Sequence, residues 1–265
     1  MTLNCTQWGL HEFRDQKEIR LNWARLRVRL IRRDRDLLLV EIRDDREIVE
    51  LGDDPESDFR RYAFERNLRA IRVLPMMPDR PILVQPLHPL RLAPKAEVEF
   101  YLSIPVDIQL STPVPGPTDP ALFEPLERLQ SEILSDSWFG DQIQGVFCYA
   151  LKSRARRERP QLESGSDSRA ICKIKIENSS EVQLHVSKFC LRLERCHIWQ
   201  KDNELWSSPI HIRYRGTDQL TAIDYYETAP EELGDCTRIA DAEKDPTENL
   251  ISRTFSGIGS AFASI

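Results

Sequence analysis

Thiol and imidazole side chains are the groups in this chain best suited to hold a metal ion. Cys190, Cys196 and His197 lie close together in the sequence, and Cys172 or Cys148 could complete the set. These ligand types suit zinc. Many zinc sites contain a CxxC motif, in which two residues separate the cysteines, and this chain has no such motif. The adjacent Cys196 and His197 would also point to opposite faces of a strand. We therefore predict no metal site and interpret the cysteines as small apolar core residues.

A second candidate for chemistry is the stretch WFGDQIQGVFCYA, residues 138–150, in which Cys148 follows a polar run between two glycines. Such a cysteine could be a reactive thiol or a core residue. In residues 146–151, VFCYAL, both alternating sets of side chains are apolar, which is typical of a central strand covered on both faces. A cysteine buried in this way has a raised pKa and reacts slowly. We therefore expect Cys148 to be packed in the core.

Sequence motifs for catalysis are missing from the chain. It contains neither of the glycine-rich phosphate-binding patterns, GxxxxGK[ST] and GxGxxG, and no GxSxG nucleophile turn. Its five histidines are scattered, and no pair has the HExxH spacing of a zinc hydrolase. We therefore predict no catalytic residue and no cofactor, and expect that the protein is not an enzyme.

Charge argues against nucleic acid as a partner. The chain has 265 residues and a net charge of −6, so it has no overall basic field. Residues 20–33 contain six arginines and no acid, and this cluster could contact phosphates. Acidic residues follow directly, and a paired strand would set several of them opposite the arginines, so we favour a salt-bridged sheet face. The acids concerned are Asp34, Asp36, Glu41, Asp44 and Asp45.

Membrane insertion is not indicated by the sequence. No segment approaches the ~20 consecutive apolar residues of a membrane-spanning helix. The first residues, MTLNCTQWGLHEF, lack the cationic start and apolar core of a signal peptide. We predict a cytoplasmic protein whose six cysteines stay reduced.

Short strand patterns fill the first part of the chain. From Leu21 onward, apolar Ala24, Leu26, Val28 and Leu30 alternate with arginines, which indicates a half-exposed strand. Further apolar pieces follow between prolines. Residues 111–125 hold five prolines and a glycine, a composition typical of a linker. We predict an N-terminal β domain over residues 1–112 and a linker over 113–136.

About six strand patterns at regular spacing follow in residues 137–230, which we predict to be a second β-sandwich domain. In ICKIKIEN, residues 171–178, apolar side chains share one face and lysines the other. Residues 178–181, Asn-Ser-Ser-Glu, supply turn chemistry. Trp199 and Trp206 flank a KDNE turn and are predicted to be cross-strand core partners. The predicted fold is mostly β, with two antiparallel β-sandwich domains, immunoglobulin-like or jelly-roll-like.

The last segment, residues 231–265, is predicted to be an acidic connector followed by an amphipathic helix. On a helix, one apolar arc would carry Leu250, Ile251, Phe255, Ile258 and Phe262, and these are the predicted partner-binding residues. Two glycines would destabilise the helix by ~1 kcal/mol each, so it should need a surface to form on. Three surfaces are open: the protein's own body or a sister subunit, a groove on another protein, or a lipid interface.

Two stretches carry a family resemblance. PLRLAPKAEVEFYLSIPVDIQL, residues 89–110, and SWFGDQIQGVFCYALKS, residues 137–153, resemble an uncharacterised bacterial and archaeal family known only as a domain of unknown function. The resemblance covers most of the chain and transfers no catalytic residue. It also implies a link to genes for small mechanosensitive channels, and hence an accessory role near a membrane.

The function predicted from these features is a non-enzymatic protein-binding or accessory module. Its partner would be a protein, with a membrane-associated one as the case that the resemblance favours, or a second copy of the chain. The alternative is a small-ligand binder or an enzyme with its site in a cleft between the two domains. The residues predicted nearest to such a cleft are Trp138, Phe139, Asp141 and Tyr149, with Trp138 and Phe139 anchoring the domain junction.

Overall fold

The computed structural model describes residues 7–14, 17–43, 59–114, 122–140, 143, 145–153, 155–158, 167–216, 221–247 and 250–252. These residues form β-strands and two short 3-10 helices, with no α-helix among them. The prediction of a mostly β protein with antiparallel sheets is therefore confirmed. No helix in the described part of the chain is long and apolar enough to cross a membrane.

The chain folds into two compact units, each of which is built from separate segments. Unit 1 combines residues 1–76, 106–132 and 164–168, and unit 2 combines residues 77–105, 133–163 and 169–265. These boundaries differ from the contiguous domains predicted from the sequence. Residues 77–105 belong to unit 2, and the predicted linker, residues 113–136, contains a strand of unit 1.

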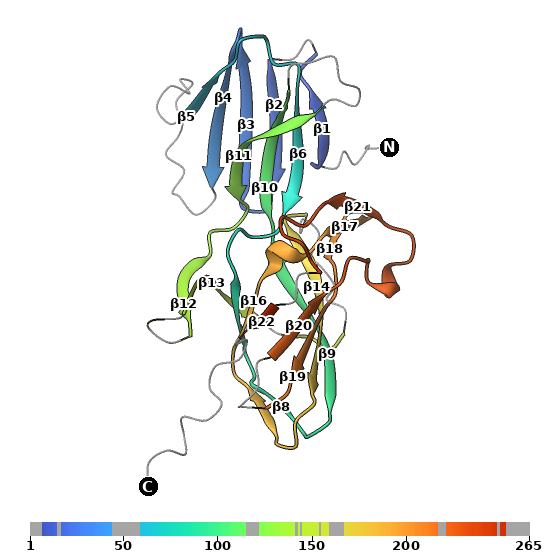
Figure 1. Ribbon diagram of the computed structural model, residues 1–265. Helices are drawn as coiled ribbons and strands as arrows, with labels where there is room; N and C mark the ends of the chain where they lie inside the picture. Colours follow the sequence, from blue (N-terminus) through green and yellow to red (C-terminus); the bar gives the residue numbers. More distant parts are fainter. Residues whose placement is uncertain are drawn as a thin grey trace. The chain divides into compact units, whose positions relative to one another are not determined.

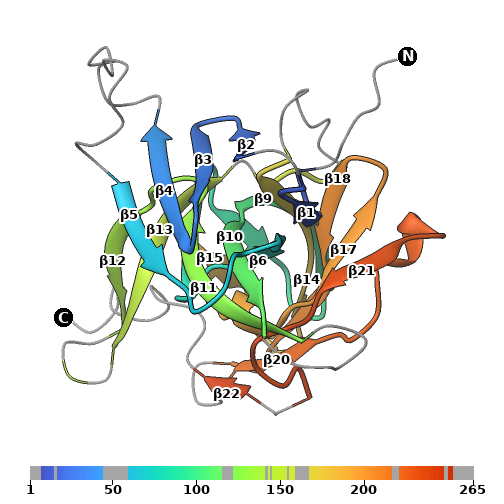
Figure 2. The same ribbon diagram turned by 90° about the horizontal axis from the view of Figure 1, so that it is seen from above.

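Unit 1 contains two four-stranded antiparallel sheets, which Figures 1 and 2 show as separate layers. One sheet has the strand order β1-β6-β10-β11 and the other the order β2-β3-β4-β5. The strands are β1 (Gly9–Glu12), β2 (Glu18–Trp23), β3 (Leu26–Arg33), β4 (Asp36–Arg43), β5 (Phe59–Ala63), β6 (Ala70–Met76), β10 (Asp107–Pro113) and β11 (Phe123–Gln130).

The predicted alternation near Leu21 is present, but it belongs to a hairpin rather than to one strand. Strand β2 ends at Trp23, and Ala24 and Arg25 form the turn into β3. Trp23 lies opposite Leu26, so the apolar residues of both strands share one buried face. The buried positions change from odd numbers in β2 to even numbers in β3, because the residues on either side of a two-residue turn face each other. Ala24, predicted to lie on the apolar face, is exposed in this turn.

The arginine-rich face of this sheet is partly neutralised by ion pairs. Arg29 pairs with Glu18 at 2.6 Å, and Arg20 pairs with the same carboxylate at 2.9 Å. For Arg20 and Arg29 the opposing acid thus comes from strand β2. Asp44 and Asp45, two of the acids predicted for this role, lie outside the described residues. Arg61 of β5 pairs with Asp36 of β4, which is one of the acids predicted for this role.

Unit 2 has a larger and more mixed sheet arrangement. Its sheets have the strand orders β12-β13-β7-β16, β15-β8, and β21-β17-β18-β14-β19-β20-β22, with β9 also pairing β14. The strands are β7 (Ile82–Pro86), β8 (Leu90–Leu92), β9 (Glu97–Pro105), β12 (Ser135–Phe139), β13 (Val146–Ser153), β14 (Arg169–Asn178), β15 (Leu184–Val186), β16 (Phe189–Leu191), β17 (Ile198–Lys201), β18 (Glu204–Ser207), β19 (Ile210–Tyr214), β20 (Thr221–Tyr225), β21 (Thr237–Ala240) and β22 (Leu250–Ser252). The 3-10 helices are η2 (Leu193–Arg195) and η3 (Glu231–Leu233).

Strand pairing in unit 2 departs from the predicted antiparallel arrangement. Strand β14 runs parallel to both β18 and β19, and β13 runs parallel to β7. The long antiparallel partner of β14 is β9, which pairs with it from Glu97 to Pro105. This pairing brings β9 into unit 2, because β14 takes up its main-chain hydrogen bonds along its whole length.

The predicted acidic connector after Tyr226 is partly packed onto unit 2. Strand β21 pairs with β17, and Leu233 of η3 is buried beside Trp206. Further along, the amide of Ala242 donates to Nδ1 of His197 at 3.0 Å, and the amide of Lys244 donates to the carbonyl of Glu194 at 3.0 Å. Main-chain hydrogen bonds therefore hold this acidic segment in place, although its composition predicts a connector exposed to solvent.

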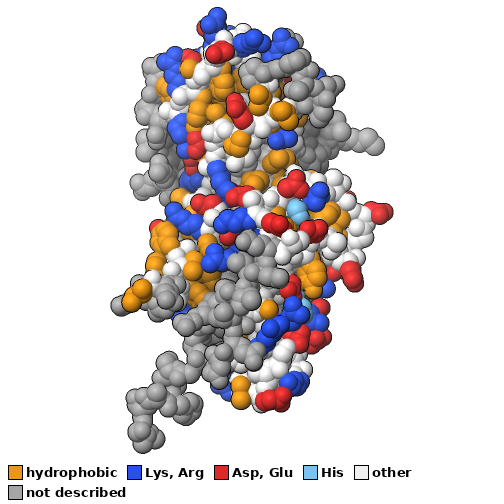
Figure 3. Space-filling model, viewed as in Figure 1, with side chains coloured by type: hydrophobic (Ala, Val, Ile, Leu, Met, Phe, Trp, Pro, Cys, Tyr) orange, Lys and Arg blue, Asp and Glu red, His pale blue; other side chains and the backbone are white. Residues whose placement is uncertain are grey.

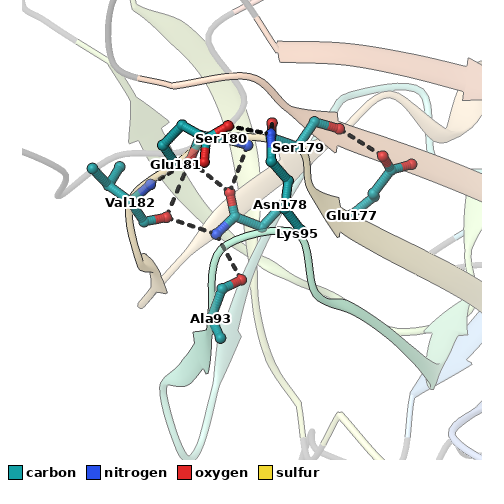
Figure 4. A network of polar contacts seen from close by, with 8 residues as sticks. All are labelled: Ala93, Lys95, Glu177, Asn178, Ser179, Ser180, Glu181 and Val182. Atoms are coloured by element: carbon teal, nitrogen blue, oxygen red, sulfur yellow. Dashed lines mark hydrogen bonds and ion pairs between the residues drawn. The ribbon is translucent and has the colours of Figure 1, made fainter.

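Asn178 organises the end of β14, as Figure 4 shows. Its side chain is fully buried. Its Nδ2 donates to the carbonyls of Leu92, Ala93 and Val182 at 3.2, 3.0 and 2.8 Å, and its Oδ1 accepts from the amide and the hydroxyl of Ser180 at 3.1 and 2.7 Å. The turn predicted over residues 178–181 is thus present, and its amide side chain ties together two loops distant in sequence.

Candidate functional site

The sequence-predicted site residues around position 140 lie on the hairpin formed by β12 and β13. Trp138 and Phe139 end strand β12, and Tyr149 lies within β13. Asp141 lies outside the described residues. Trp138 lies directly opposite Phe147 in the antiparallel register, so these two aromatic side chains share one face of the hairpin.

The two faces of the hairpin have different environments. On one face, Phe139, Cys148, Leu83 and Cys190 form a buried cluster. On the other face, Trp138 is 48 % exposed and Phe147 is 46 % exposed. The hairpin connection adds Ile143, which is 92 % exposed. Large apolar side chains are seldom gathered at the surface without a role in recognition, so this face is the strongest candidate for an interaction surface.

Arg80 completes this surface from a distant part of the sequence. Its guanidinium lies 4.6 Å from the ring centroid of Phe147 and 5.1 Å from that of Tyr149, and it pairs with Asp136 at 3.1 Å. We call Arg80, Asp136, Trp138 and Phe147 the hairpin surface. Figure 3 shows hydrophobic side chains gathered over this part of unit 2, with basic side chains beside them.

Phe139 and Tyr149 do not belong to the exposed surface. Phe139 is 4 % exposed and Tyr149 is 5 % exposed, and the Tyr149 hydroxyl donates to Asp79 at 3.0 Å. The prediction that Cys148 is packed in a central strand is confirmed, because it is fully buried and β13 lies between β12 and β7. The prediction that both faces of β13 are covered is wrong at Phe147. This residue is half-exposed and precedes the part of β13 that pairs with β7.

The metal-ligand candidates are divided between two places in unit 2. Cys190 packs against Cys148, whereas Cys196 is a buried neighbour of Cys172. Nδ1 of His197 accepts a hydrogen bond from the amide of Ala242, so this nitrogen is not available as a ligand. Within the described ranges, no three histidine, cysteine or acidic side chains are grouped in a way that could hold a metal ion.

Burial also sets the protonation state of these cysteines. It raises the pKa of Cys190 and of Cys172 to about 12 each, and that of Cys196 well above its usual range. Burial likewise raises the pKa of Cys148. These residues are therefore neutral thiols at physiological pH, and neutral thiols are poor nucleophiles.

We expect Cys148 to resist thiol reagents in the native protein. It can react only when the strand opens, and an opening free energy of about 3 kcal/mol would slow labelling about 100-fold relative to the unfolded chain. Site-resolved mass spectrometry after a timed pulse of N-ethylmaleimide measures this rate. The partly exposed Cys236 is the internal control and should be labelled first. Labelling of Cys148 as fast as in urea would contradict its packing.

The predicted partner-binding helix at the C-terminus has a different outcome. Leu250 and Ile251 lie in strand β22, which pairs with β20, so the helix prediction is wrong for these residues. The pairing with β20 supplies main-chain partners that a local amphipathic pattern cannot reveal. Phe255, Ile258 and Phe262 lie outside the described residues.

Comparison with known proteins places the chain in one family. Residues 7–259 match a family described as "Protein of unknown function (DUF432)". No curated protein and no solved structure gives a significant match. The family match supports the resemblance of residues 89–110 and 137–153 to an uncharacterised family, and shows no association with mechanosensitive channels. Since the match spans nearly the whole chain, the protein belongs to the DUF432 family of proteins of unknown function.

Proposed function

We propose that this protein is a non-enzymatic protein-binding module and that the hairpin surface is where its partner docks. The observation that supports this function is the half-exposed pair of Trp138 and Phe147 on one face of a two-stranded hairpin. Both rings are fixed on paired strands, so little conformational entropy is lost when a partner covers them.

The composition of the hairpin surface favours a protein partner. Aromatic and arginine side chains dominate the binding energy of protein interfaces. Arg80 stacks over Phe147 and faces Asp136, so the surface combines an apolar centre with a polar rim. The expected partner presents an apolar surface of matching size with hydrogen-bonding groups at its border.

A lipid surface is less well supported by the same residues. Membrane-surface binding usually combines apolar insertion with several basic side chains that face anionic headgroups. Here Arg80 is ion-paired with Asp136, and Asp79 lies close by through its bond to Tyr149. The balance of charge favours a polypeptide over an anionic bilayer. A membrane-associated protein partner and a cytoplasmic location are proposals that rest on the sequence.

The test is a capture experiment followed by reconstitution. The full chain would be used as bait in native extract in three forms: wild type, Trp138→Ser with Phe147→Ser, and Val182→Ser. Val182 is a matched control because it is 55 % exposed and lies outside the hairpin. We expect one protein to be recovered with the wild type and the control but not with the double variant. Calorimetry with that purified protein should show affinity weakened at least about tenfold by the double variant.

Two further arms separate the other surfaces. A chain ending at Ser252 keeps strand β22 and removes Phe255, Ile258 and Phe262. Loss of the partner in that truncation, with the double variant unaffected, would place the site on the C-terminal segment. Binding to phosphatidylserine-containing vesicles that is lost in the double variant would overturn the proposal in favour of lipid. Equal recovery of all proteins by the three baits would also overturn it.

A further inference from the structure

A groove lies where β1 and β2 meet in unit 1, whereas the residues of the hairpin surface belong to unit 2. It has a volume of about 600 Å³ and is lined by residues of both strands, among them Leu10, Glu12, Glu18 and Arg20. Among the residues that the structure describes, each strand is the last in its sheet, because β1 pairs with β6 alone and β2 with β3 alone. Figure 1 shows both at the ends of their sheets. The groove therefore lies between two sheet edges.

Main-chain groups on the β1 wall point into this groove. The amide of Phe13 donates to the carbonyl of Arg69, which marks these two as a hydrogen-bonded pair in the β1–β6 register. In an antiparallel ladder such pairs alternate with pairs whose main-chain groups point away. Leu10 and Glu12 are of the second kind, so their N–H and C=O groups face outward from β6.

The β2 wall follows the same rule. The amide of Arg32 donates to the carbonyl of Lys17, which fixes the phase of the β2–β3 ladder. The main-chain groups of Glu18, Arg20 and Asn22 then point away from β3. At Asn22 this direction is visible, because its amide donates to the side-chain Oε1 of Gln7 at 3.0 Å. A carboxamide carbonyl thus already occupies the place that a strand carbonyl would take.

The charges at the rim of the groove are balanced. Glu12 pairs with Arg14 at 2.9 Å, and Glu18 pairs with Arg20 at 2.9 Å. Hydrogen bonds from Arg20 and Arg29 lower the pKa of Glu18 to about 2, so its carboxylate stays ionised at physiological pH. A ligand selected by such a rim is not strongly charged, and its recognition would rely on the main chain.

We propose that this groove binds one extended segment of a partner polypeptide, which adds a strand between β1 and β2. Strand addition uses main-chain hydrogen bonds for affinity and is a common mode of peptide recognition. The edge of a second folded copy is a poorer fit, since that strand is backed by its own sheet. The proposal is independent of the hairpin surface, which lies in unit 2.

The experiment uses a displayed library of random twelve-residue peptides selected on the full chain. Selected peptides are expected to share extended, uncharged sequences, and their affinity should change little between 50 and 500 mM salt. Hydrogen exchange of the wild-type chain should show slower exchange at the amides of Leu10, Glu12, Glu18 and Arg20 when a selected peptide is bound.

A proline variant tests the main-chain contact. Glu12→Pro removes an N–H that the β1–β6 ladder does not use, so the sheet should tolerate it. Glu12→Ala is the control, because it removes the same side chain and keeps the N–H. We expect peptide affinity to fall about tenfold in the proline variant alone. Peptides that bind both variants equally and protect none of the four amides would overturn the proposal. A dimer that Glu12→Pro dissociates would overturn it in favour of a second copy.

Discussion

Replacing Asn178 by aspartate should lower the free energy of unfolding by about 3–5 kcal/mol at pH 7, since a buried charge would be left uncompensated. The amide Nδ2 that donates to the carbonyls of Leu92, Ala93 and Val182 would become a carboxylate oxygen facing the same three acceptors. Acceptors cannot bond to one another, and the site is fully buried, so water cannot compensate. Urea unfolding followed by circular dichroism measures the change.

The same variant should become more stable, relative to the wild type, as the pH falls. Burial against three carbonyls raises the pKa of the introduced carboxyl above the value of about 3.9 for an unfolded aspartate. The folded state then binds more protons than the unfolded state, so stability is regained as the pH falls through the raised pKa.

Two controls separate the buried network from a general effect of charge. Asn203→Asp makes the same substitution at an exposed turn position and should change stability by less than about 0.5 kcal/mol. Asn178→Ala removes the hydrogen bonds without adding charge and should be destabilising by about 2–3 kcal/mol. Equal stability of Asn178→Asp and Asn203→Asp would contradict the role of Asn178 in holding the two loops together.

Replacing Trp206 by alanine should also be strongly destabilising, by about 3–5 kcal/mol. Trp206 is 1 % exposed, packs against Ile171 and Leu233, and meets the ring of Tyr101 edge-on at 6.2 Å between centroids. It lies opposite Trp199 in the β17–β18 register, which confirms the predicted cross-strand partnership. Removing the indole would leave a cavity beneath η3, so hydrogen exchange should also rise at Leu233.

Trp138→Ala is the matched control for this prediction. It removes the same side chain at a position that is 48 % exposed, and should be destabilising by about 1 kcal/mol or less. Comparing the two urea midpoints therefore separates burial from side-chain size. Equal midpoints would show that the cluster around Trp206 contributes little to the stability of unit 2.

Local sequence patterns predicted the strands well where the burial is one-sided. The alternation around Leu26 and Val28 became β3, and the lysine-flanked pattern around Ile174 became β14. The turn at Asn178 was predicted because its residue types favour turns in any context. Each of these features depends on neighbours within a few positions along the chain.

Features that depend on distant partners were missed. The pattern in residues 97–105 is a plain strand pattern, and nothing within it indicates that its partner is β14. At the C-terminus, Leu250 and Ile251 fit a helical arc equally well, and only the presence of β20 selects a strand. The candidate site combines both kinds of feature. Residues 138–150 alone indicate Trp138 as a site residue. The stacking of Arg80 on Phe147 joins distant parts of the sequence and is visible only in the folded hairpin.

The pairing of β9 with β14 also sets an order of events during synthesis. Pro105, the last residue of β9, precedes Arg169, the first residue of β14, by 64 positions. At ~5–20 residues per second, the ribosome needs roughly 3–13 s to produce that stretch. During this interval β9 lacks the strand that takes up its main-chain hydrogen bonds, and Phe189, which packs against Phe100, emerges later still. Such unpaired nascent strands with apolar side chains are natural clients of chaperones. The nascent chain is therefore most vulnerable to aggregation midway through translation, before β14 emerges.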